Sequence, residues 1–342
     1  MNKISELTDF LNKGGIADKN QIQEAFDGIM SGKVETEDLK KFLLALKDRE
    51  TPEIIAGAAS SMRQAMIKIN VRDYPEEIVL DTCGTGGSLF HTFNISTVAA
   101  FVIAGCGIKV AKHGNRAVSS KFGSADVLKE LGLNLEISPK KVEEIIKEIG
   151  IGFMFAPLYH PAMKYAAQAR KEIAARTIFN ILGPLCNPAG ADTQIVGVYE
   201  ERLSDIIARA LGELGSKRAF VIYSARGLDE VSIEGQTSVV ELKEGNVNPA
   251  CQVSPSDFGV NEAGLGNITP GNNSSENAKI ILDILKGEES HRRDAVLINA
   301  ALGIVAAGKT GDFKQAKGIG EESLASGNAL KKLELLIERS RQ

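Results

Sequence analysis

After residue 75, short β-rich runs alternate with helical segments, and this alternation restricts the fold more than any other feature of the chain. Such a chain forms a mostly parallel sheet covered by helices, because each helix returns the chain across the sheet in a right-handed crossover. Helices are expected to start at Ser138-Pro139 and to fill 201–214. The expected strands are 78–80, 109–111, 152–155, 195–199 and 219–223. The sequence therefore predicts an α/β fold with ligands at the carboxyl ends of the strands.

The first 70 residues have a different pattern, in which apolar residues recur at helical spacing. Thr36 and Thr51 stand where helix caps are expected, and Pro52 follows Thr51 at the first helical position. This pattern predicts a small all-helical unit that buries its apolar stripes, either as a lid or as a dimer face.

The change of pattern predicts two domains. A helical domain is expected over 1–72 and an α/β catalytic domain over 73–342. The segment 161–185 begins with a helical pattern and either covers the sheet or packs with the helical domain. The segment 259–275 has few apolar residues and is expected to be a long loop.

Composition excludes several classes of protein. The 342 residues carry a net charge of −4, which argues against a general nucleic-acid or membrane-surface binder, since those need a positive field. The four cysteines are widely spaced, so neither a zinc ribbon nor a disulfide framework is expected. No apolar run is long enough for a membrane span, and the amino terminus lacks the pattern of a signal peptide. We therefore expect a cytoplasmic protein with reduced thiols.

The segment 81–88, Asp-Thr-Cys-Gly-Thr-Gly-Gly-Ser, predicts a phosphate-binding loop between a strand and a helix. Its glycines let a bulky anion approach the main chain, and Ser96 and Thr97 open the next helix, whose free N–H groups attract anions. The glycine spacing differs from the dinucleotide fingerprint and from the P-loop. A phosphorylated small molecule is the expected ligand, and a tight turn that binds nothing is the alternative.

The segment 112–124 combines four basic or titratable side chains with three serines, directly after an expected strand. Point charges and neutral donors together suit a loop that wraps a polyanion. The alternative is a solvated surface loop.

Asp229 and Glu230 stand in a glycine-containing turn just after the expected strand 219–223. Mg²⁺ often binds only one or two carboxylates together with substrate phosphates and water, so this pair suffices for a site. A solvated turn is the alternative.

His160, Arg170, Arg176 and Asn180 lie in or near the helical part of 161–185. Arginine can hold a planar carboxylate through two parallel hydrogen bonds. The alternative is that each arginine forms a surface ion pair. The four histidines lack the spacing of metal ligands.

In combination, these segments resemble the anthranilate phosphoribosyltransferase family over nearly the whole chain. The matching motifs, in order, are Gly84-Thr85-Gly86-Gly87, Thr92-Phe93-Asn94-Ile95-Ser96-Thr97, Lys112-His113-Gly114-Asn115-Arg116, Arg176-Thr177-x-x-Asn180-x-x-Gly183-Pro184 and Gly227-Leu228-Asp229-Glu230. The Lys-His-Gly-Asn-Arg run is the most specific, because pyrimidine nucleoside phosphorylases of the same fold lack it. The resemblance implies a small helical domain and a larger α/β domain of the nucleoside phosphorylase/phosphoribosyltransferase kind.

The resemblance also implies an activity. Family members are glycosyltransferases of tryptophan biosynthesis that join anthranilate to phosphoribosyl pyrophosphate (PRPP), release pyrophosphate and use Mg²⁺. Homodimers through the amino-terminal helices are typical of the family. The aryl amine of anthranilate is already neutral at pH 7, so we expect catalysis to depend on stabilising the charge of the leaving pyrophosphate rather than on a general base.

Motif positions imply the site residues. Lys112, Arg170, Asp229 and Glu230 are the expected catalytic residues, with Ser96, Asp229 and Glu230 at the metal. Anthranilate is expected near Gly84, Asn115 and Arg170, with His113 and His160 beside its ring and amine. The expected PRPP-binding residues are Gly84, Gly87, Ser88, Thr92, Asn94, Ile95, Ser96, Thr97, Lys112, His113, Gly114, Asn115, Arg116, Ala117, Val118, Ser119, Ser120 and Ser124.

The chain departs from the family pattern at three places. Ser88 stands where many members have Asp, Leu89-Phe90 replaces a glycine-containing link, and Phe122 stands where a small residue is usual. Two other functions remain open from the sequence: a nucleoside phosphorylase reaction on the same fold, and a non-enzymatic relative that binds nucleic acid. The negative net charge and the intact Asp229-Glu230 pair disfavour the second.

Overall fold

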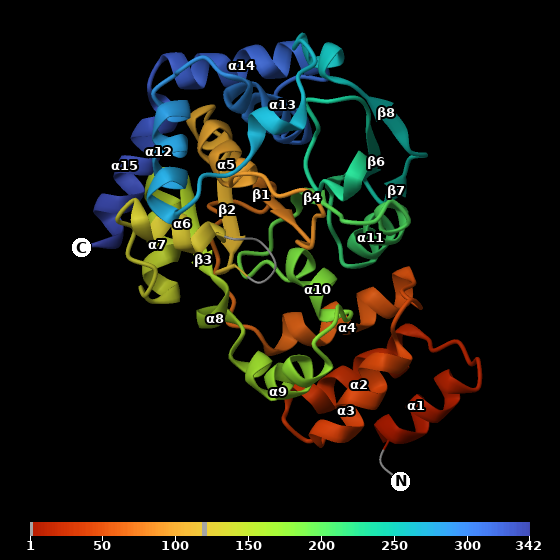
Figure 1. Ribbon diagram of the computed structural model, residues 1–342. Helices are drawn as coiled ribbons and strands as arrows, with labels where there is room; N and C mark the ends of the chain where they lie inside the picture. Colours follow the sequence, from red (N-terminus) through yellow and green to blue (C-terminus); the bar gives the residue numbers. More distant parts are fainter. Residues whose placement is uncertain (1–2, 118–121) are drawn as a thin grey trace.

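The computed structural model describes residues 3–117 and 122–342, which form a helical unit beside a larger α/β unit (Figure 1). The helical unit contains α1 (Lys3–Asn12), α2 (Lys19–Met30), α3 (Thr36–Ala45) and α4 (Pro52–Ala65). Thr51 caps α4 as expected, because its hydroxyl accepts the N–H of Ile54 at 3.3 Å. Thr36 is not a cap: α3 begins at this residue, and Glu35 precedes it without a side-chain hydrogen bond.

The α/β unit is built on one mixed sheet. Its strands are β1 (Val79–Gly84), β2 (Lys109–Gly114), β3 (Ile151–Phe155), β4 (Thr193–Gly197), β5 (Arg218–Ser224), β6 (Thr237–Lys243), β7 (Asn246–Val247) and β8 (Cys251–Val253). The order is β3-β2-β1-β4-β5-β6-β7, and β8 also pairs with β6. The first five strands are parallel, and β6 to β8 add an antiparallel edge that the sequence patterns did not predict.

Helices cover the sheet on both faces. They are α5 (Ile95–Gly105), α6 (Ser124–Glu130), α7 (Pro139–Ile149), α11 (Leu203–Glu213), α12 (Ser274–Leu285), α13 (His291–Ala306), α14 (Phe313–Ala325) and α15 (Asn328–Ser340). On β5, Phe220 and Ile222 belong to the core beneath α5 and α13, whereas Val221 belongs to the core that includes α11 and the helical unit. This alternation with a period of two explains why the strand is apolar throughout: both of its faces are buried.

The segment 161–185 is helical in pieces. It contains η1 (Pro161–Met163), α9 (Lys164–Ile173), α10 (Phe179–Leu182) and η2 (Gly183–Leu185), and α8 (Ala156–Tyr159) precedes it. The expected continuous helix stops at Ala174, which adopts a left-handed conformation with φ of 50°. Helix α9 packs on α2 and α3, and Lys40 on α3 forms an ion pair with Glu172 on α9 at 2.8 Å. The segment thus links the two units.

Other connections also contain short 3₁₀ turns. These are η3 (Ala225–Gly227), η4 (Pro255–Phe258) and η5 (Leu265–Ile268), the last of which interrupts the expected loop 259–275. Within the described part of the chain, no helix has the length and apolar character needed to cross a membrane.

Candidate active site

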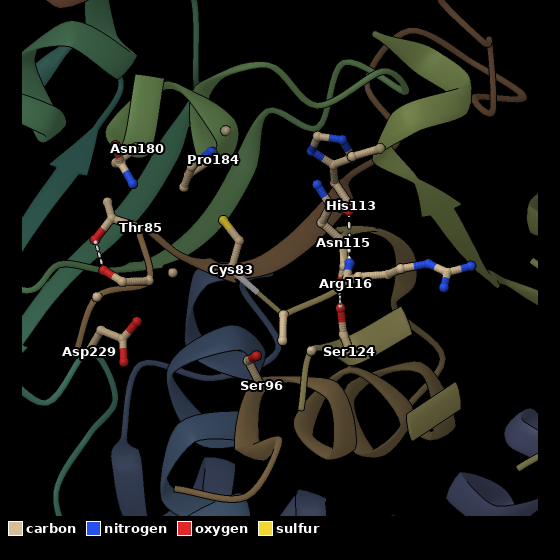
Figure 2. A pocket seen from close by; sticks show the side chains of 18 of the residues that line it. Cys83, Thr85, Ser96, His113, Asn115, Arg116, Ser124, Asn180, Pro184 and Asp229 are labelled. Atoms are coloured by element: carbon tan, nitrogen blue, oxygen red, sulfur yellow. Dashed lines mark hydrogen bonds between the residues drawn. The ribbon is translucent and has the colours of Figure 1, made fainter. Parts of the chain in front are cut away.

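A cavity of about 710 Å³ opens at the carboxyl edge of the parallel strands. It lies where the strand order changes direction, because β2 and β3 follow on one side of β1 and β4 and β5 on the other. Such a switch point leaves a crevice between diverging connections and is the usual ligand site of α/β sheets. Figure 2 shows the cavity with Cys83 between Asp229 and His113.

The glycine-rich loop follows β1 directly and forms one side of the cavity. A Cβ at Gly84 would stand 2.5 Å from Oδ2 of Asp229, and a Cβ at Gly197, the last residue of β4, would overlap the carbonyl oxygen of Asp229. Both glycines are therefore needed for the Asp229 turn to lie against the ends of β1 and β4.

Ser88 has a defined role in this loop. Its hydroxyl oxygen lies 2.8 Å from the carbonyl oxygens of both Phe90 and Gly227. The hydroxyl can donate its proton to either carbonyl, so it ties the glycine-rich loop to the turn that precedes the acidic pair. Leu89 packs against Gly227 and is otherwise exposed. Ser88 thus makes a neutral contact between these two loops.

Asp229 and Glu230 are brought to the cavity by the turn after β5. Burial raises the pKa of both carboxyl groups, and burial together with the charge of Asp229 raises the pKa of Glu230 to about 8. Oε1 of Glu230 accepts the N–H of Ser96 at 3.2 Å, at the start of α5. The two carboxyl groups can therefore bind a cation, and the positive charge of that cation would favour their ionised form.

Lys112 lies on β2 with only 4% of its surface exposed. Its Nζ donates to the carbonyl oxygen of Thr82 at 2.6 Å, and Oγ of Ser96 lies 3.5 Å away. Burial lowers the pKa of Lys112, and the negative charges of Asp81 and Glu230 oppose that shift. A buried ammonium group therefore lies at the glycine-rich side of the cavity, where a bound anion would stabilise its charge.

Asp81 is buried beneath Lys112, and burial raises the pKa of its carboxyl group to about 6. Its oxygens accept the N–H of His113 at 3.2 Å and the Nδ2 hydrogen of Asn187 at 2.8 Å. This network fixes the end of β2, from which Lys112 and His113 project.

His113 and His160 lie next to each other on the other side of the cavity, with ring centroids 5.0 Å apart and ring planes tilted by 48°. Burial lowers the pKa of His113 to about 3 and that of His160 to about 4, so both rings are neutral at pH 7. Nε2 of each ring is buried without a hydrogen-bond partner among the described residues. Two unpaired ring nitrogens at a cavity wall are an unfavourable arrangement until a ligand reaches them.

Arg170 on α9 reaches the same side of the cavity and lies over the ring of Phe179 at 5.4 Å. Partial burial lowers the pKa of its guanidinium group. Within the described residues it has no carboxylate partner. The guanidinium group is thus available for an external carboxylate.

The segment after β2 is held at both ends by one carboxylate. Oδ2 of Asp126 accepts the N–H of Ala117 at 3.0 Å and that of Gly123 at 2.9 Å. Nδ2 of Asn94 donates to the carbonyl of Phe122 at 3.1 Å, which connects this segment to the glycine-rich side. Phe122 itself lines the cavity and adds an apolar ring to its wall.

Most of the residues singled out from the sequence line this cavity. Ile95 does not, because it is fully buried in the core at the start of α5, and Arg176 instead lies over Tyr199 in a second, smaller cavity. Val118, Ser119 and Ser120 fall outside the described residues. Those that line it are Gly84, Gly87, Ser88, Thr92, Asn94, Ser96, Thr97, Lys112, His113, Gly114, Asn115, Arg116, Ala117, Ser124, His160, Arg170, Asp229 and Glu230.

Several lining residues were not expected as site residues. Met62 comes from α4 and Met163 from η1, and neither has a sequence signal, because methionine is typical of any core. Pro184 also lines the cavity and belongs to the Arg176–Pro184 motif, as does Asn180, which the sequence had singled out with His160, Arg170 and Arg176. Cys83 also lines the cavity, but burial raises the pKa of its thiol well above the usual value, so it is no nucleophile.

The oxygen atoms of Asp229, Glu230 and Ser96 suit Mg²⁺, but they are too few to coordinate a metal ion without water or substrate. Within 3–117 and 122–342, no three His, Cys, Asp or Glu side chains are grouped closely enough to hold a metal. Two adjacent carboxylates beside the Ser96 hydroxyl offer oxygen ligands only, which suits a hard cation that keeps water and substrate phosphates as its other ligands.

Comparisons with known proteins agree with this geometry. Residues 8–66 match the helical bundle domain of the glycosyl transferase family, and residues 76–330 match its a/b domain. The anthranilate phosphoribosyltransferase of Desulfatibacillum aliphaticivorans is 46% identical over 336 residues, 98% of each chain.

Two solved structures extend the agreement. The anthranilate phosphoribosyltransferase of Thermus thermophilus has a TM-score of 0.92 and 39% identity, with full coverage of both chains. The Saccharomyces cerevisiae enzyme in complex with PRPP and Mg has a TM-score of 0.89 and 30% identity, covering 99% of this chain and 98% of that one. The likeness confirms the two-unit fold expected from the sequence. The chain belongs to the anthranilate phosphoribosyltransferase family of glycosyltransferases.

Proposed function

We propose that this protein transfers the phosphoribosyl group of PRPP to the amine of anthranilate and releases pyrophosphate. The observation that carries the proposal is one cavity with two chemically different sides. One side has a glycine-rich main chain, a buried ammonium group and two carboxylates. The other has two neutral imidazoles and a guanidinium group that has no carboxylate partner in the described part of the chain. A phosphorylated sugar suits the first side and a small aromatic acid the second.

PRPP occupies the glycine-rich side in this proposal. Helix α5 begins at Ile95 rather than at Ser96, and the N–H groups of its first turn already have protein partners, so it contributes the positive end of its dipole on this side. Lys112 supplies a full positive charge there. Asn94, Asn115 and Arg116 add donors along the same side. When pyrophosphate leaves, negative charge grows on its oxygens, and the Lys112 ammonium group stabilises it in a site of low dielectric.

Asp229, Glu230 and Ser96 hold Mg²⁺ in this proposal, and the yeast relative bound to PRPP and Mg supports the choice of cation. When bound, the ion neutralises phosphate charge and aids departure of the pyrophosphate. Proton competition at Glu230 follows from its raised pKa, so the metal is expected to bind better as the pH rises toward 8.

Anthranilate occupies the histidine side in this proposal. Arg170 holds its carboxylate, with Gly84 and Asn115 nearby. The amine of anthranilate has two N–H groups, and the Nε2 atoms of His113 and His160 are the acceptors left free for them. The neutral rings orient the amine toward the sugar carbon without having to remove a proton first, because the amine is already neutral.

Several finer statements belong to the same proposal. We place the domain boundary near residue 72, with the segment 161–185 packed against the helical domain, and we propose a homodimer formed through the amino-terminal helices. A cytoplasmic location and the absence of nucleic-acid binding remain predictions from the sequence.

The test is pyrophosphate release from PRPP, measured with and without anthranilate and with and without Mg²⁺. Release that requires both components supports the proposal, and the double variant Asp229→Asn, Glu230→Gln is expected to lose it. If a nucleoside is cleaved by phosphate instead, a phosphorylase reaction replaces the proposal. A salt-sensitive shift of DNA without any pyrophosphate release would replace it with a binding role.

A further inference from the structure

Asn299 is a polar residue in the apolar middle of α13, with 3% of its surface exposed. Its Oδ1 accepts the N–H of Val231 at 2.8 Å. Its Nδ2 donates to the carbonyl of Val231 at 3.1 Å and to the carbonyl of Ala295 at 2.8 Å. A buried amide is costly unless it is fully hydrogen-bonded, and here all three bonds are made. Two of the three bonds are made with Val231, which directly follows Asp229 and Glu230 in the sequence.

The main chain around that pair is also held from other directions. Oγ of Ser224 donates to the carbonyl of Glu230 at 2.7 Å, and the N–H of Ser232 donates to Oγ1 of Thr237 at 3.0 Å. On the opposite side, the close approach at Gly197 fixes the position of Asp229. Among these contacts, only that of Asn299 comes from a helix. Its side-chain amide bonds both the N–H and the carbonyl of Val231.

We propose that Asn299 is a positioning residue for the acidic pair. It fixes the main chain at Val231 and thereby sets where the carboxylates of Asp229 and Glu230 reach into the cavity. The inference rests on the proposed function, because it concerns how well this pair holds a divalent cation.

Physical reasons favour this role over simple packing. Neighbouring side chains on α13, such as Val296, Ile298 and Leu302, are apolar and fully buried, so a leucine would suit position 299 better if volume alone mattered. Two adjacent carboxylates repel each other once both are charged, and this repulsion pushes the turn away from a compact geometry. Directional hydrogen bonds from a well-packed helix oppose that movement. Groups that orient metal ligands in this way typically change metal affinity by about 10- to 100-fold when removed.

The chain contains a matched control. Asn277 on α12 is 1% exposed and makes the same pattern of bonds. Its Oδ1 accepts the N–H of Gly271 at 3.1 Å, and its Nδ2 donates to the carbonyls of Gly271 at 3.4 Å and Asn273 at 2.8 Å. Gly271 does not line the cavity, so this amide holds a loop that has no part in the site.

The experiment compares Asn299→Leu with Asn277→Leu in the full chain. Both variants are expected to melt at lower temperature, since each leaves peptide groups of a loop unpaired. Asn299→Leu is expected to raise the Mg²⁺ concentration for half-maximal pyrophosphate release by about tenfold or more. Mn²⁺ binding in the presence of PRPP, read from water-proton relaxation, is expected to weaken by a similar factor, whereas Asn277→Leu changes both by less than about twofold.

Equal metal dependence in the two variants, at equal loss of thermal stability, would overturn the inference. If Asn299→Leu does not fold, Asn299→Ala is measured against Asn277→Ala in its place, because alanine removes the same hydrogen bonds without adding volume or charge and favours the helix; the same difference in metal dependence is expected. Wild-type protein that releases no pyrophosphate would overturn the proposed function instead, and the Mn²⁺ comparison would still decide whether Asn299 positions the pair.

Discussion

The two sides of the cavity are prepared for their ligands in different ways. The sheet-edge side comprises Gly84, Lys112, Asp229 and Glu230, and its charged groups already have protein partners: Lys112 donates to Thr82, and Glu230 accepts from Ser96. The histidine side comprises His113, His160, Arg170 and Phe179, and there both Nε2 atoms lack a partner among the described residues.

This difference has an energetic meaning. A group that already has a protein partner exchanges one hydrogen bond for another when a ligand binds, so its gain comes mainly from charge. An unpaired buried nitrogen gains a bond without giving one up. We therefore expect the sheet-edge side to control the rate through electrostatics and the histidine side to control which acceptor binds. The predictions below test this division, beginning with the largest expected effect.

Lys112→Met removes the buried charge of the sheet-edge side and keeps the volume. We expect kcat to fall by about 10²- to 10³-fold, the usual loss when a charge-stabilising donor is removed. Stability should change little, because methionine avoids the desolvation cost of an ammonium group. Steady-state kinetics and a thermal melt measure both quantities. A decrease in kcat of less than about fivefold would mean that the charge of Lys112 contributes little to the reaction.

Two arginine variants should separate the sides. Arg170→Ala is expected to raise KM for anthranilate by about 10- to 100-fold, because the variant loses a hydrogen bond between charged groups. KM for PRPP should stay within about twofold of the wild-type value. Arg176 donates to the carbonyl of Gly87 at 2.6 Å and stacks on Tyr199 at 4.2 Å, so Arg176→Ala should instead raise KM for PRPP. Equal changes in both Michaelis constants for either variant would break the proposed division.

Only the sheet-edge side should respond to pH between 6 and 8. Glu230, with a pKa of about 8, binds a proton that competes with the metal, so the half-maximal Mg²⁺ concentration should fall by about tenfold or more between pH 6 and pH 8. His113 and His160, with pKa values of about 3 and about 4, stay neutral, so KM for anthranilate should be constant over that range.

The contributions of the histidines and of Glu230 to the free energy of unfolding depend on pH in opposite directions. The depressed pKa values of the histidines mean that the unfolded chain binds more protons, so their contribution is lost as the pH falls from 6.5 toward 4. The raised pKa of Glu230 means that the folded chain keeps its proton, so its contribution is lost as the pH rises from 4.5 toward 8. In chemical denaturation between pH 4 and pH 6.5, the free energy of unfolding of His160→Gln should fall less steeply with decreasing pH than that of wild type. An unchanged slope would contradict the burial of this ring.

Ser88 should give the smallest effect. Ser88→Ala removes one hydrogen bond between the glycine-rich loop and the Gly227 turn, worth about 1 kcal/mol, and should raise KM for PRPP by about two- to fivefold. Ser88→Asp brings a carboxylate against two carbonyl oxygens and should raise it further when Mg²⁺ is scarce. An improvement of the aspartate variant at low Mg²⁺ would show that the neutral contact has no role.

Sequence patterns predicted the parts of the structure that depend on local chemistry. Each of the five parallel strands overlaps its expected range, although β4 lies two residues earlier than expected and β1 extends four residues further. The start of α7 after Ser138 and the cap at Thr51 lie where they were expected. Burial on both faces gives these strands apolar runs, and caps need particular side chains, so both leave a trace in the sequence.

What the sequence did not predict depends on contacts between distant segments. Strand β6 carries Ser238, Glu241 and Lys243 on an edge hairpin, and such mixed polarity is also typical of loops. The break at Ala174 has no glycine or proline to mark it, and it exists because α9 packs on α2 and α3 while α10 turns toward the sheet. Asn299 lies 68 residues from the turn that it holds, so no local motif could have indicated it.

Gly197 has a consequence for how this protein can change over generations. Every substitution of this glycine by another amino acid adds at least a Cβ, and at this position that atom would collide with the carbonyl oxygen of Asp229. Only synonymous changes of the codon are tolerated while the acidic turn stays where it is. The end of β4 and the turn that carries Asp229 are therefore inherited as a pair, although they lie 32 positions apart in the chain.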